Sequence, residues 1–323
     1  VKMAVVIYAI YGDTTPDATL TLAVEDSTIQ PDETVSVAVT VDSDDYIASA
    51  VVLDLGIPNA TISAASTTLY DGVVTDLVDN ITGGFKILLG DIIDTSPRTG
   101  TWDFSYSKEG TWAVTVNARS DNMVDKTATL NVIVDGTEPG AVTNLTSTSH
   151  TKLTWSNNPN ITWTWSPALD GGSGLQGYGI DEDWSCILPS TSVDLGTVTS
   201  YTGGPYPSTT QGVHLNIRSV DRSDNWDSDF VCDGPYLIDV DAPGIATFNS
   251  SDHTVGGKSC NPSITVSWNA APDAHSGIFG YDVEWSQNPI TCPFSGTSSW
   301  KAQSTTTLTQ GTWWCHVRAV DKV

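Results

Sequence analysis

The sequence predicts an all-β protein built from three tandem β-sandwich domains, and three observations support this fold class. The chain has 323 residues, which fits three sandwiches of about 100 residues, each able to bury its own core. Thr, Ser and Val fill short runs with apolar residues at every second position, as at residues 34–40, which is typical of half-buried strands. The second and third parts of the chain also repeat each other at a spacing near one sandwich.

The first domain is expected at residues 13–136, after an apolar N-terminal strand at 1–12. Turn signals such as Lys108-Glu109-Gly110 separate its strand candidates, which are Ala18–Val24, Glu33–Val41, Ala48–Leu55, Thr101–Ser107, Thr111–Arg119 and Lys126–Val134. This pattern predicts a hairpin-rich sandwich that diverges from the other two domains.

The second and third domains, residues 137–240 and 241–323, are predicted from an internal repeat. The spacing from Trp165 to Trp268 is 268 − 165 = 103 residues, the length of one sandwich. Pro139-Gly140 and Pro243-Gly244 recur after Asp135 and Asp239, and Pro-Gly pairs punctuate strands. Domain boundaries near 137 and 241 follow.

One motif of the repeat is specific enough to suggest a family. Asp-x-x-Ser-Gly-x-x-x-Tyr begins at Asp170 and at Asp273, and Arg-x-Val-Asp follows at 218–221 and 318–321. Over residues 137–323 this pattern resembles the fibronectin-III-like and Ig-like repeats of bacterial and archaeal cell-surface proteins. The resemblance implies Ig-like or fibronectin-III-like sandwiches that act as spacers, adhesive modules or building blocks of surface layers and filaments.

Charge and cysteine content indicate the compartment and exclude one class of partner. The chain carries 13 Lys and Arg against 38 Asp and Glu, a formal net charge of −25, which repels nucleic acid and anionic lipid. Five cysteines without a Cys-x-x-Cys pair favour disulfides and an extracellular, cell-surface location. Five Asn-x-Ser/Thr sequons, candidates for N-glycosylation, begin at Asn59, Asn80, Asn144, Asn160 and Asn249.

The cysteines predict two disulfides. Cys186 and Cys232 are the two cysteines of domain two and are expected to pair. In domain three the repeat alignment places Cys260 just before one strand and Cys315 in a strand of the other sheet, a familiar bridge in sandwiches. Cys292 then remains unpaired or has a partner beyond residue 323.

Aspartates in the repeated loops are the candidate metal ligands. Asp170, Asp221, Asp273 and Asp321 supply the oxygen atoms that Ca²⁺ accepts. The alternative is that these carboxylates accept backbone N–H bonds in Asx-type turns. No complete Asp-x-Asp-x-Asp-Gly loop is present, so we favour the Asx turns and expect no other cofactor.

Tryptophans and histidines give a weaker indication of function. Trp165 and Trp268 occupy equivalent strand positions and are expected in cores. A glycan-stacking role stays open for the others, against ordinary packing, at Trp155, Trp184, Trp226, Trp285 and Trp300. The histidines form no metal-binding pair at short spacing, and no nucleophile elbow or phosphate loop is found. We therefore expect no enzyme; a hydrolase would need convergent carboxylates that the sequence does not reveal.

The two ends of the chain suggest a route to polymers. Only Lys322 and Val323 follow Asp321, so domain three is expected to lack its last strand. A neighbour's N-terminal strand could fill the gap by β-strand addition, using Ala4, Val5, Val6, Ile7, Tyr8, Ala9, Ile10 and Tyr11. Head-to-tail addition of this kind generates filaments. The alternative is that the sequence is a piece of a longer protein.

Together these features predict an extracellular structural protein, a self-associating subunit of a surface filament, sheath or surface layer. The alternative is an adhesin or carbohydrate-binding module of a larger secreted protein, with glycans as partners. The stretch Val1 to Tyr11 is too short to span a bilayer.

Overall fold

The computed structural model describes residues 3–7, 18–43, 48–57, 60–69, 72–75, 78–81, 84–92, 97–121, 124–290 and 303–323. Within these ranges the chain is all-β, as predicted, and its strands form six sheets. The strands and three hydrophobic clusters divide along the chain into segment one (residues 3–135), segment two (136–239) and segment three (240–323).

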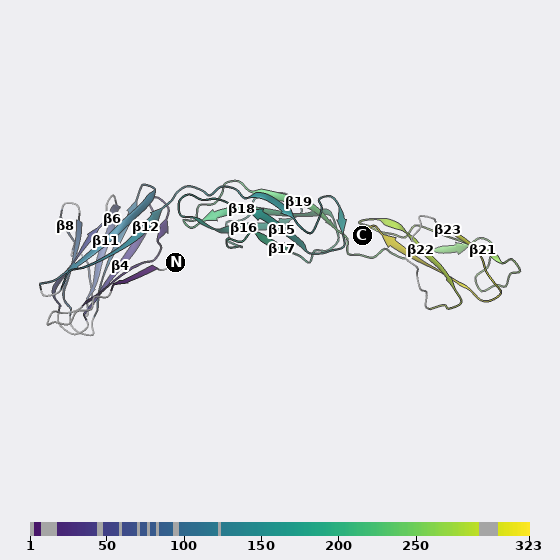
Figure 1. Cartoon of the computed structure of the whole chain (residues 1–323), viewed down its shortest axis with the longest axis horizontal. Helices are drawn as coiled ribbons and strands as arrows, with labels where there is room; N and C mark the ends of the chain where they lie inside the picture. Colours follow the sequence, from purple (N-terminus) through teal and green to yellow (C-terminus); the bar gives the residue numbers. More distant parts are fainter. Residues whose placement is uncertain are drawn as a thin grey trace.

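Segment one consists of two six-stranded sheets packed face to face (Figure 1). The first sheet has the order β1-β2-β4-β10-β6-β7, with β1 Met3–Ile7, β2 Ala18–Val24, β4 Thr34–Ser43, β10 Arg98–Tyr106, β6 Ala60–Leu69 and β7 Gly72–Thr75. The second has the order β3-β12-β11-β5-β9-β8, with β3 Thr28–Ile29, β12 Lys126–Val134, β11 Gly110–Arg119, β5 Ala48–Gly56, β9 Gly84–Ile92 and β8 Val78–Ile81.

Strict alternation of apolar residues places the core of segment one between its two sheets. Along β2 every second side chain is buried, and Leu20 and Leu22 are fully buried. From β10 the side chains of Trp102, Phe104 and Tyr106 enter the same core. Because strand side chains point to opposite faces in turn, this sequence pattern fixes which face each strand buries.

The N-terminal strand corrects the expectation of a free donor strand. β1 pairs antiparallel with β2 of the same chain, from Met3 opposite Val24 to Ile7 opposite Leu20, so Ala4–Ile7 already have a partner. Closing a short connection within one chain costs little conformational entropy, which favours this pairing over addition to a neighbour. The rest of the predicted donor, Tyr8–Tyr11, lies outside the described residues.

Segment two is a smaller sandwich with a three-stranded and a four-stranded sheet. The first has the order β13-β15-β17, with β13 Thr143–Ser147, β15 Ile161–Ser166 and β17 Ser200–Gly203. The second has the order β14-β19-β18-β16, with β14 Trp155–Ser156, β19 Val231–Ile238, β18 Thr209–Asp221 and β16 Leu175–Asp183. Trp163, Tyr178 and Tyr236 are its largest fully buried side chains.

Segment three repeats this arrangement. Its sheets are β20-β21-β23 and β22-β24, with β20 Phe248–Ser250, β21 Ser263–Trp268, β23 Gln303–Thr307, β22 Ile278–Ser286 and β24 Trp314–Asp321. The predicted core tryptophans are confirmed: Trp165 and Trp268 are both 5% exposed. Each packs edge-on against a tyrosine with ring centroids 5.5 Å apart, Trp165 on Tyr178 and Trp268 on Tyr281.

One sheet of segment three is narrower than its counterpart. β18 lies between β16 and β19, whereas β24 pairs with β22 alone among the described strands. Leu215 and Ile217 of β18 are fully buried, while the equivalent Cys315 and Val317 of β24 are half-buried. The side of β24 away from β22 is therefore less covered than the corresponding side of β18 among the described strands.

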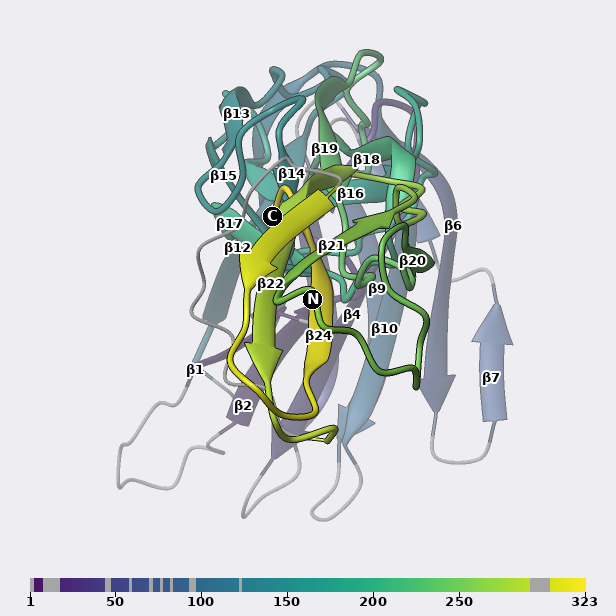
Figure 2. The same cartoon turned by 90° about the vertical axis from the view of Figure 1, so that its right-hand side faces the viewer.

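The three segments follow one another along the long axis of the molecule (Figure 1). Viewed along that axis, they lie one behind another with β22 and β24 nearest the viewer (Figure 2). We call the contact between segments one and two junction one, and that between segments two and three junction two. β24 runs back toward junction two, so the C-terminus lies between segments two and three (Figure 1).

Candidate functional site

Junction one is organised around Asp135, the residue that directly follows β12. Its backbone N–H donates to the Ile29 carbonyl (2.9 Å), which continues the parallel pairing of β12 with β3. Its carboxylate Oδ2 accepts a hydrogen bond from the backbone N–H of Ser173 (2.6 Å). The Asn225 side chain donates to the Asp135 carbonyl (2.8 Å). The last residue of segment one is therefore held by two loops of segment two.

The loop that carries Ser173 is shaped by Asp170. Asp170 Oδ2 accepts from the N–H groups of Gly172 (3.1 Å) and Gly174 (2.6 Å), an Asx-type turn. Gly174 has φ +85°, a conformation that glycine adopts without strain. A Cβ on Gly172 would lie 2.2 Å from Asp135 Oδ2, so the absence of a side chain lets the loop approach the carboxylate.

Three carboxylates converge at junction one. Oxygens of Asp135, Asp170 and Asp221 lie within 4.8 Å of one another. Asp221 ends β18, is fully buried, and its Oδ1 accepts from the N–H groups of Ser223 (2.8 Å) and Asn225 (2.9 Å). The ends of two strands, β12 and β18, and the turns at Asp170 and Asp221 therefore meet at this point.

Burial and hydrogen bonding give two of these carboxylates opposite pKa shifts. Burial raises the pKa of Asp221, and the nearby charge of Asp135 raises it further, against hydrogen bonds from Asn225 and Ser223. Burial also raises the pKa of Asp135, but hydrogen bonds led by the Ser173 and Thr137 N–H groups outweigh it, so this pKa is lowered. Such splitting is expected when buried carboxylates share a site.

Junction two repeats this geometry. Asp239 directly follows β19, its N–H donates to the Ser156 carbonyl (2.9 Å), and its Oδ2 accepts from the Ser276 N–H (2.9 Å). Oxygens of Asp239, Asp273 and Asp321 again lie within 4.8 Å of one another. We call the two sets, Asp135/Asp170/Asp221 and Asp239/Asp273/Asp321, the aspartate trios.

The loop of Asp273 also repeats the Asx turn. Asp273 Oδ1 accepts from the N–H groups of His275 (2.9 Å) and Gly277 (3.1 Å), and Gly277 has φ +79°. The expected Asx turns at Asp170 and Asp273 are thus confirmed by their hydrogen bonds.

Each junction adds contacts of its own. At junction one the Thr28 hydroxyl donates to the Arg222 carbonyl (2.8 Å). At junction two His275 replaces the equivalent Gly172. Its Nδ1 lies 3.7 Å from Asp241 Oδ2, and its ring meets Trp155 of segment two with centroids 6.2 Å apart. A surface hollow also lies beside each junction. At junction one its lining includes Asp26, Asp32 and Asp224. At junction two its lining includes Asp241, Asp273 and His275.

The structure brings all four aspartates predicted from the sequence to the junctions, two to each. Sequence reasoning missed Asp135 and Asp239, although the signal was present: both precede the repeated Pro-Gly linker. That repeat predicts domain boundaries, but it does not by itself predict that the boundary residue joins the loop carboxylates.

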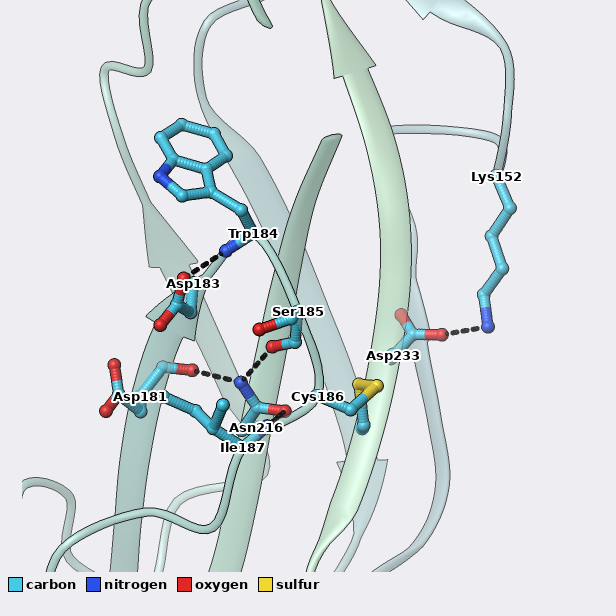
Figure 3. Close-up of a disulfide and its surroundings, with 10 residues drawn as sticks. Lys152, Asp181, Asp183, Trp184, Ser185, Cys186, Ile187, Asn216 and Asp233 are labelled. Carbon is cyan, nitrogen blue, oxygen red and sulfur yellow. Dashed lines mark hydrogen bonds and ion pairs between the residues drawn. A yellow bond between two sulfur atoms is a disulfide. The ribbon is translucent and has the colours of Figure 1, made fainter. Parts of the chain in front are cut away.

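A disulfide fastens one loop of segment two (Figure 3). Cys186 and Cys232 are bonded, with Cα atoms 5.7 Å apart. The buried Asn216 holds the loop: its amide donates to the Ser185 carbonyl (3.1 Å) and its Oδ1 accepts from the Ile187 N–H (3.2 Å). Beside the bridge, the Lys152 ammonium pairs with Asp233 at 2.5 Å (Figure 3).

The expected bridge between Cys260 and Cys315 is wrong. Cys260 lies in the loop before β21 with its side chain exposed, and it forms no disulfide within the described residues. Cys315 lies on β24 in the other sheet, opposite Trp285. A loop position outside the ladder does not direct its Cβ across the core, as an inter-sheet bridge requires. Cys292 lies outside the described residues.

Three of the five predicted glycosylation sites lie on the surface of the described residues. Asn144, Asn160 and Asn249 are exposed, as an acceptor must be. Asn80 lies on β8, and Asn59 lies outside the described residues. Surface position thus permits modification at three of the sequons.

Most of the tryptophans left open for glycan stacking pack against other side chains. Trp155 contacts His275 at junction two, Trp226 lies under the Arg218 guanidinium (4.8 Å to the ring centroid), and Trp285 joins the core of segment three. Trp184 is 43% exposed beside the disulfide (Figure 3). Trp300 lies outside the described residues.

Comparisons with known proteins leave the family open. No protein-family model matches the chain, and no curated protein matches its sequence. Among solved structures, the major pilin SpaD from Corynebacterium diphtheriae is similar at 10% identity and a TM-score of 0.29, covering 63% of this chain and 56% of the pilin. AvmM, which catalyzes macrocyclization in alchivemycin A biosynthesis, matches 41% of this chain and 97% of its own at 10% identity and a TM-score of 0.25.

Red sea bream transglutaminase matches 68% of this chain and 31% of its own, at 10% identity and a TM-score of 0.26. The chain thus spans about half the length of the pilin and about a third of the transglutaminase. Similarity at this level carries no argument about function. Among the described residues, no helix has the length and apolar character needed to cross a bilayer.

Proposed function

We propose that this chain is an extracellular structural protein whose tandem sandwiches form a rod-like part of a surface filament, sheath or surface layer. The observation that carries the proposal is the repeated junction. Asp135 and Asp239 each end one segment and accept a hydrogen bond from the next, through Ser173 and Ser276. A connection built the same way twice favours a fixed spacing between domains, which is what a spacer or filament subunit needs.

The chemistry of the chain supports an extracellular setting. The Cys186–Cys232 bridge is stable in oxidising compartments. A formal net charge of −25 favours solubility and discourages association with anionic surfaces.

The junction carboxylates also favour a structural role over hydrolysis. Asp135, Asp170 and Asp221 accept backbone N–H groups of the turns that join the segments. A catalytic pair would instead face a cleft that admits substrate. Carboxylates that lie between two segments and bind their turns are better suited to holding consecutive segments together than to catalysis.

Electron cryomicroscopy of the protein as secreted by its native host tests this function. We expect a periodic filament or sheet in which the chain contributes a rod of consecutive sandwiches. Isolated particles without lateral or axial order would refute the proposed assembly and favour an adhesive module.

A carbohydrate-binding function is the second candidate, and Trp184 favours it. This side chain is 43% exposed on the loop fastened by the Cys186–Cys232 bridge, and exposed aromatic rings stack on sugars. Titration of soluble glycans with the intact protein and with Trp184→Ala tests this candidate. Binding that the substitution removes would support a carbohydrate-binding module. Absence of a binding heat in isothermal titration calorimetry with either protein would exclude this function for those glycans.

A further inference from the structure

The aspartate trios contain more negative charge than the surrounding protein neutralises. In each trio three carboxylate oxygens lie within 4.8 Å of one another. Asp135, Asp221 and Asp239 are at most 3% exposed. Like charges this close and buried repel strongly unless a proton or a cation joins them.

The nearest basic side chains do not supply that cation. Arg222 and Lys322 each lie close to the glycine of the Asx loop, at Gly174 and Gly277. Among the described residues neither forms an ion pair with a trio carboxylate. At junction two the His275 imidazole lies 3.9 Å from Asp239 Oδ1 and is charged only when protonated; junction one has Gly172 at the equivalent position. A proton or a bound cation must therefore supply the remaining compensation.

Buried hydroxyl groups that face a trio carboxylate without a hydrogen bond of normal geometry are the second, independent observation. Ser173 is 4% exposed and Ser276 3% exposed. Each side chain faces the carboxylate that its own N–H binds, and neither Oγ has a hydrogen bond of normal geometry within the described residues. Buried hydroxyl groups usually form well-aligned hydrogen bonds, so a hydroxyl that only faces the carboxylate at both junctions favours a shared ligand between the two oxygens.

In Asp273 the two carboxylate oxygens have different environments. Asp273 Oδ1 accepts both loop N–H groups. Its Oδ2 is buried and has no partner in the described part of the chain. A carboxylate with one oxygen committed to a turn and the other buried and free is suited to coordinate a metal through the free oxygen.

We propose that each aspartate trio binds one divalent cation of the calcium type, which bridges the two segments at that junction. Ca²⁺ takes six to eight oxygen ligands in flexible geometry. The trio and the serine hydroxyl supply the protein part of this set, with water completing it. Asp135 and Asp239 come from the segment before each junction and the other ligands from the segment after it. The ion would therefore fix the angle between segments, whatever the function of the array.

Isothermal titration of the intact chain with CaCl₂, after removal of metal by a chelator, tests the proposal. We expect two equivalents of Ca²⁺ per chain, with dissociation constants of about 10⁻⁴ to 10⁻³ M, the range of extracellular modules. Asp170→Asn and Asp273→Asn keep an oxygen for the turn but remove the charge, so each should remove one equivalent. The matched control is Asp233→Asn, a buried aspartate outside both trios, which should retain both.

A second readout is the calcium dependence of the melting temperature, because a ligand bound only by the folded state raises it. We expect a rise for the intact chain and for Asp233→Asn, and none for Asp170→Asn/Asp273→Asn. If a trio aspartate variant fails to fold by circular dichroism, Ser173→Ala/Ser276→Ala takes its place, with weaker calcium binding expected. Absence of both heat and thermal shift in the intact chain at about 10 mM CaCl₂ would overturn the proposal. Two equivalents retained by the double aspartate variant would overturn it as well.

Discussion

The carboxylate of Asp239 accepts a hydrogen bond from the backbone N–H of Ser276, at 2.9 Å. Asp239 directly follows β19, the last strand of segment two, and Ser276 belongs to a loop of segment three. The same contact joins Asp135 to Ser173 at 2.6 Å. Because one hydrogen-bond pattern occurs at both junctions, the orientation of consecutive segments is part of the fold and not a property of a loose linker.

Gly172→Ala should disturb junction one. The added Cβ would lie 2.2 Å from Asp135 Oδ2, so the Asx loop or the carboxylate must move. Overpacking of this kind costs about 1–3 kcal/mol. Chemical denaturation should show lower stability, and proteolysis between the segments should become faster.

Gly171→Ala is the matched control for that substitution. A Cβ at Gly171 meets no atom within 4 Å, so stability and proteolysis should stay at the level of the unmodified chain. Equal behaviour of the two variants would show that close approach to Asp135 does not hold the junction.

Cys186→Ser/Cys232→Ser should lower the free energy of unfolding of segment two by about 2–4 kcal/mol. The bridge closes a loop with a sequence separation of 46 residues, and its loss restores conformational freedom to the unfolded chain. Cys260→Ser, which changes an exposed thiol, should shift stability by less than about 0.5 kcal/mol. Equilibrium denaturation under non-reducing conditions compares the three proteins; equal midpoints would contradict this account.

Asp252→Ser should lower the pKa of His253. The Asp252 carboxylate, 3.0 Å from His253 Nδ1, is the main cause that raises this pKa above 6.5, followed by the Asn261 carbonyl. The contact of protonated His253 with Asp252 stabilises the folded protein. This stabilisation is fully present below the unfolded pKa of 6.5 and is lost as pH rises through the higher folded pKa. Serine is the natural residue at the equivalent position 149, beside His150, so the fold should tolerate it.

NMR titration of the histidine ring protons measures this effect. We expect the His253 midpoint above 6.5 in the unmodified chain and a lower midpoint in Asp252→Ser. An unchanged midpoint would mean that the carboxylate does not interact with the imidazolium.

Tyr236→Phe should destabilise segment two by about 1–3 kcal/mol. The buried phenol accepts from the Ser147 N–H (3.1 Å) and donates to Asp233 Oδ2 (2.5 Å), so it joins the two sheets of the sandwich. Removing the hydroxyl leaves both groups without this partner. Urea denaturation measures the change; unaltered stability would show that water replaces the phenol without cost.

Much of the fold could be predicted from the sequence because strand periodicity and repeat spacing are local signals. Ala18–Val24 and Lys126–Val134 were predicted with the bounds that the structure has. The pairing of β1 with β2 could not be predicted, because an apolar strand can pair with any open sheet edge. The alternation of apolar residues shows which face is buried but not which strand is the partner.

The candidate site was predicted in part. Asp170 and Asp273 stand out through the repeated loop motif, and their Asx turns are local features. The approach of Asp135 to the Asp170 loop depends on how two segments meet, which no periodicity reveals. The incorrect Cys260–Cys315 pair has a similar origin, because the repeat alignment gives the order of residues but not the direction of a loop side chain.

Small-angle X-ray scattering of the intact chain tests the central claim, that the junctions hold the segments in a fixed row, most directly. We predict scattering of one elongated particle that a single arrangement of the three segments fits, and a loss of that fit when a flexible glycine-serine spacer is inserted after Asp239. Scattering that requires an ensemble of freely jointed segments, the same with and without the spacer, would contradict the account.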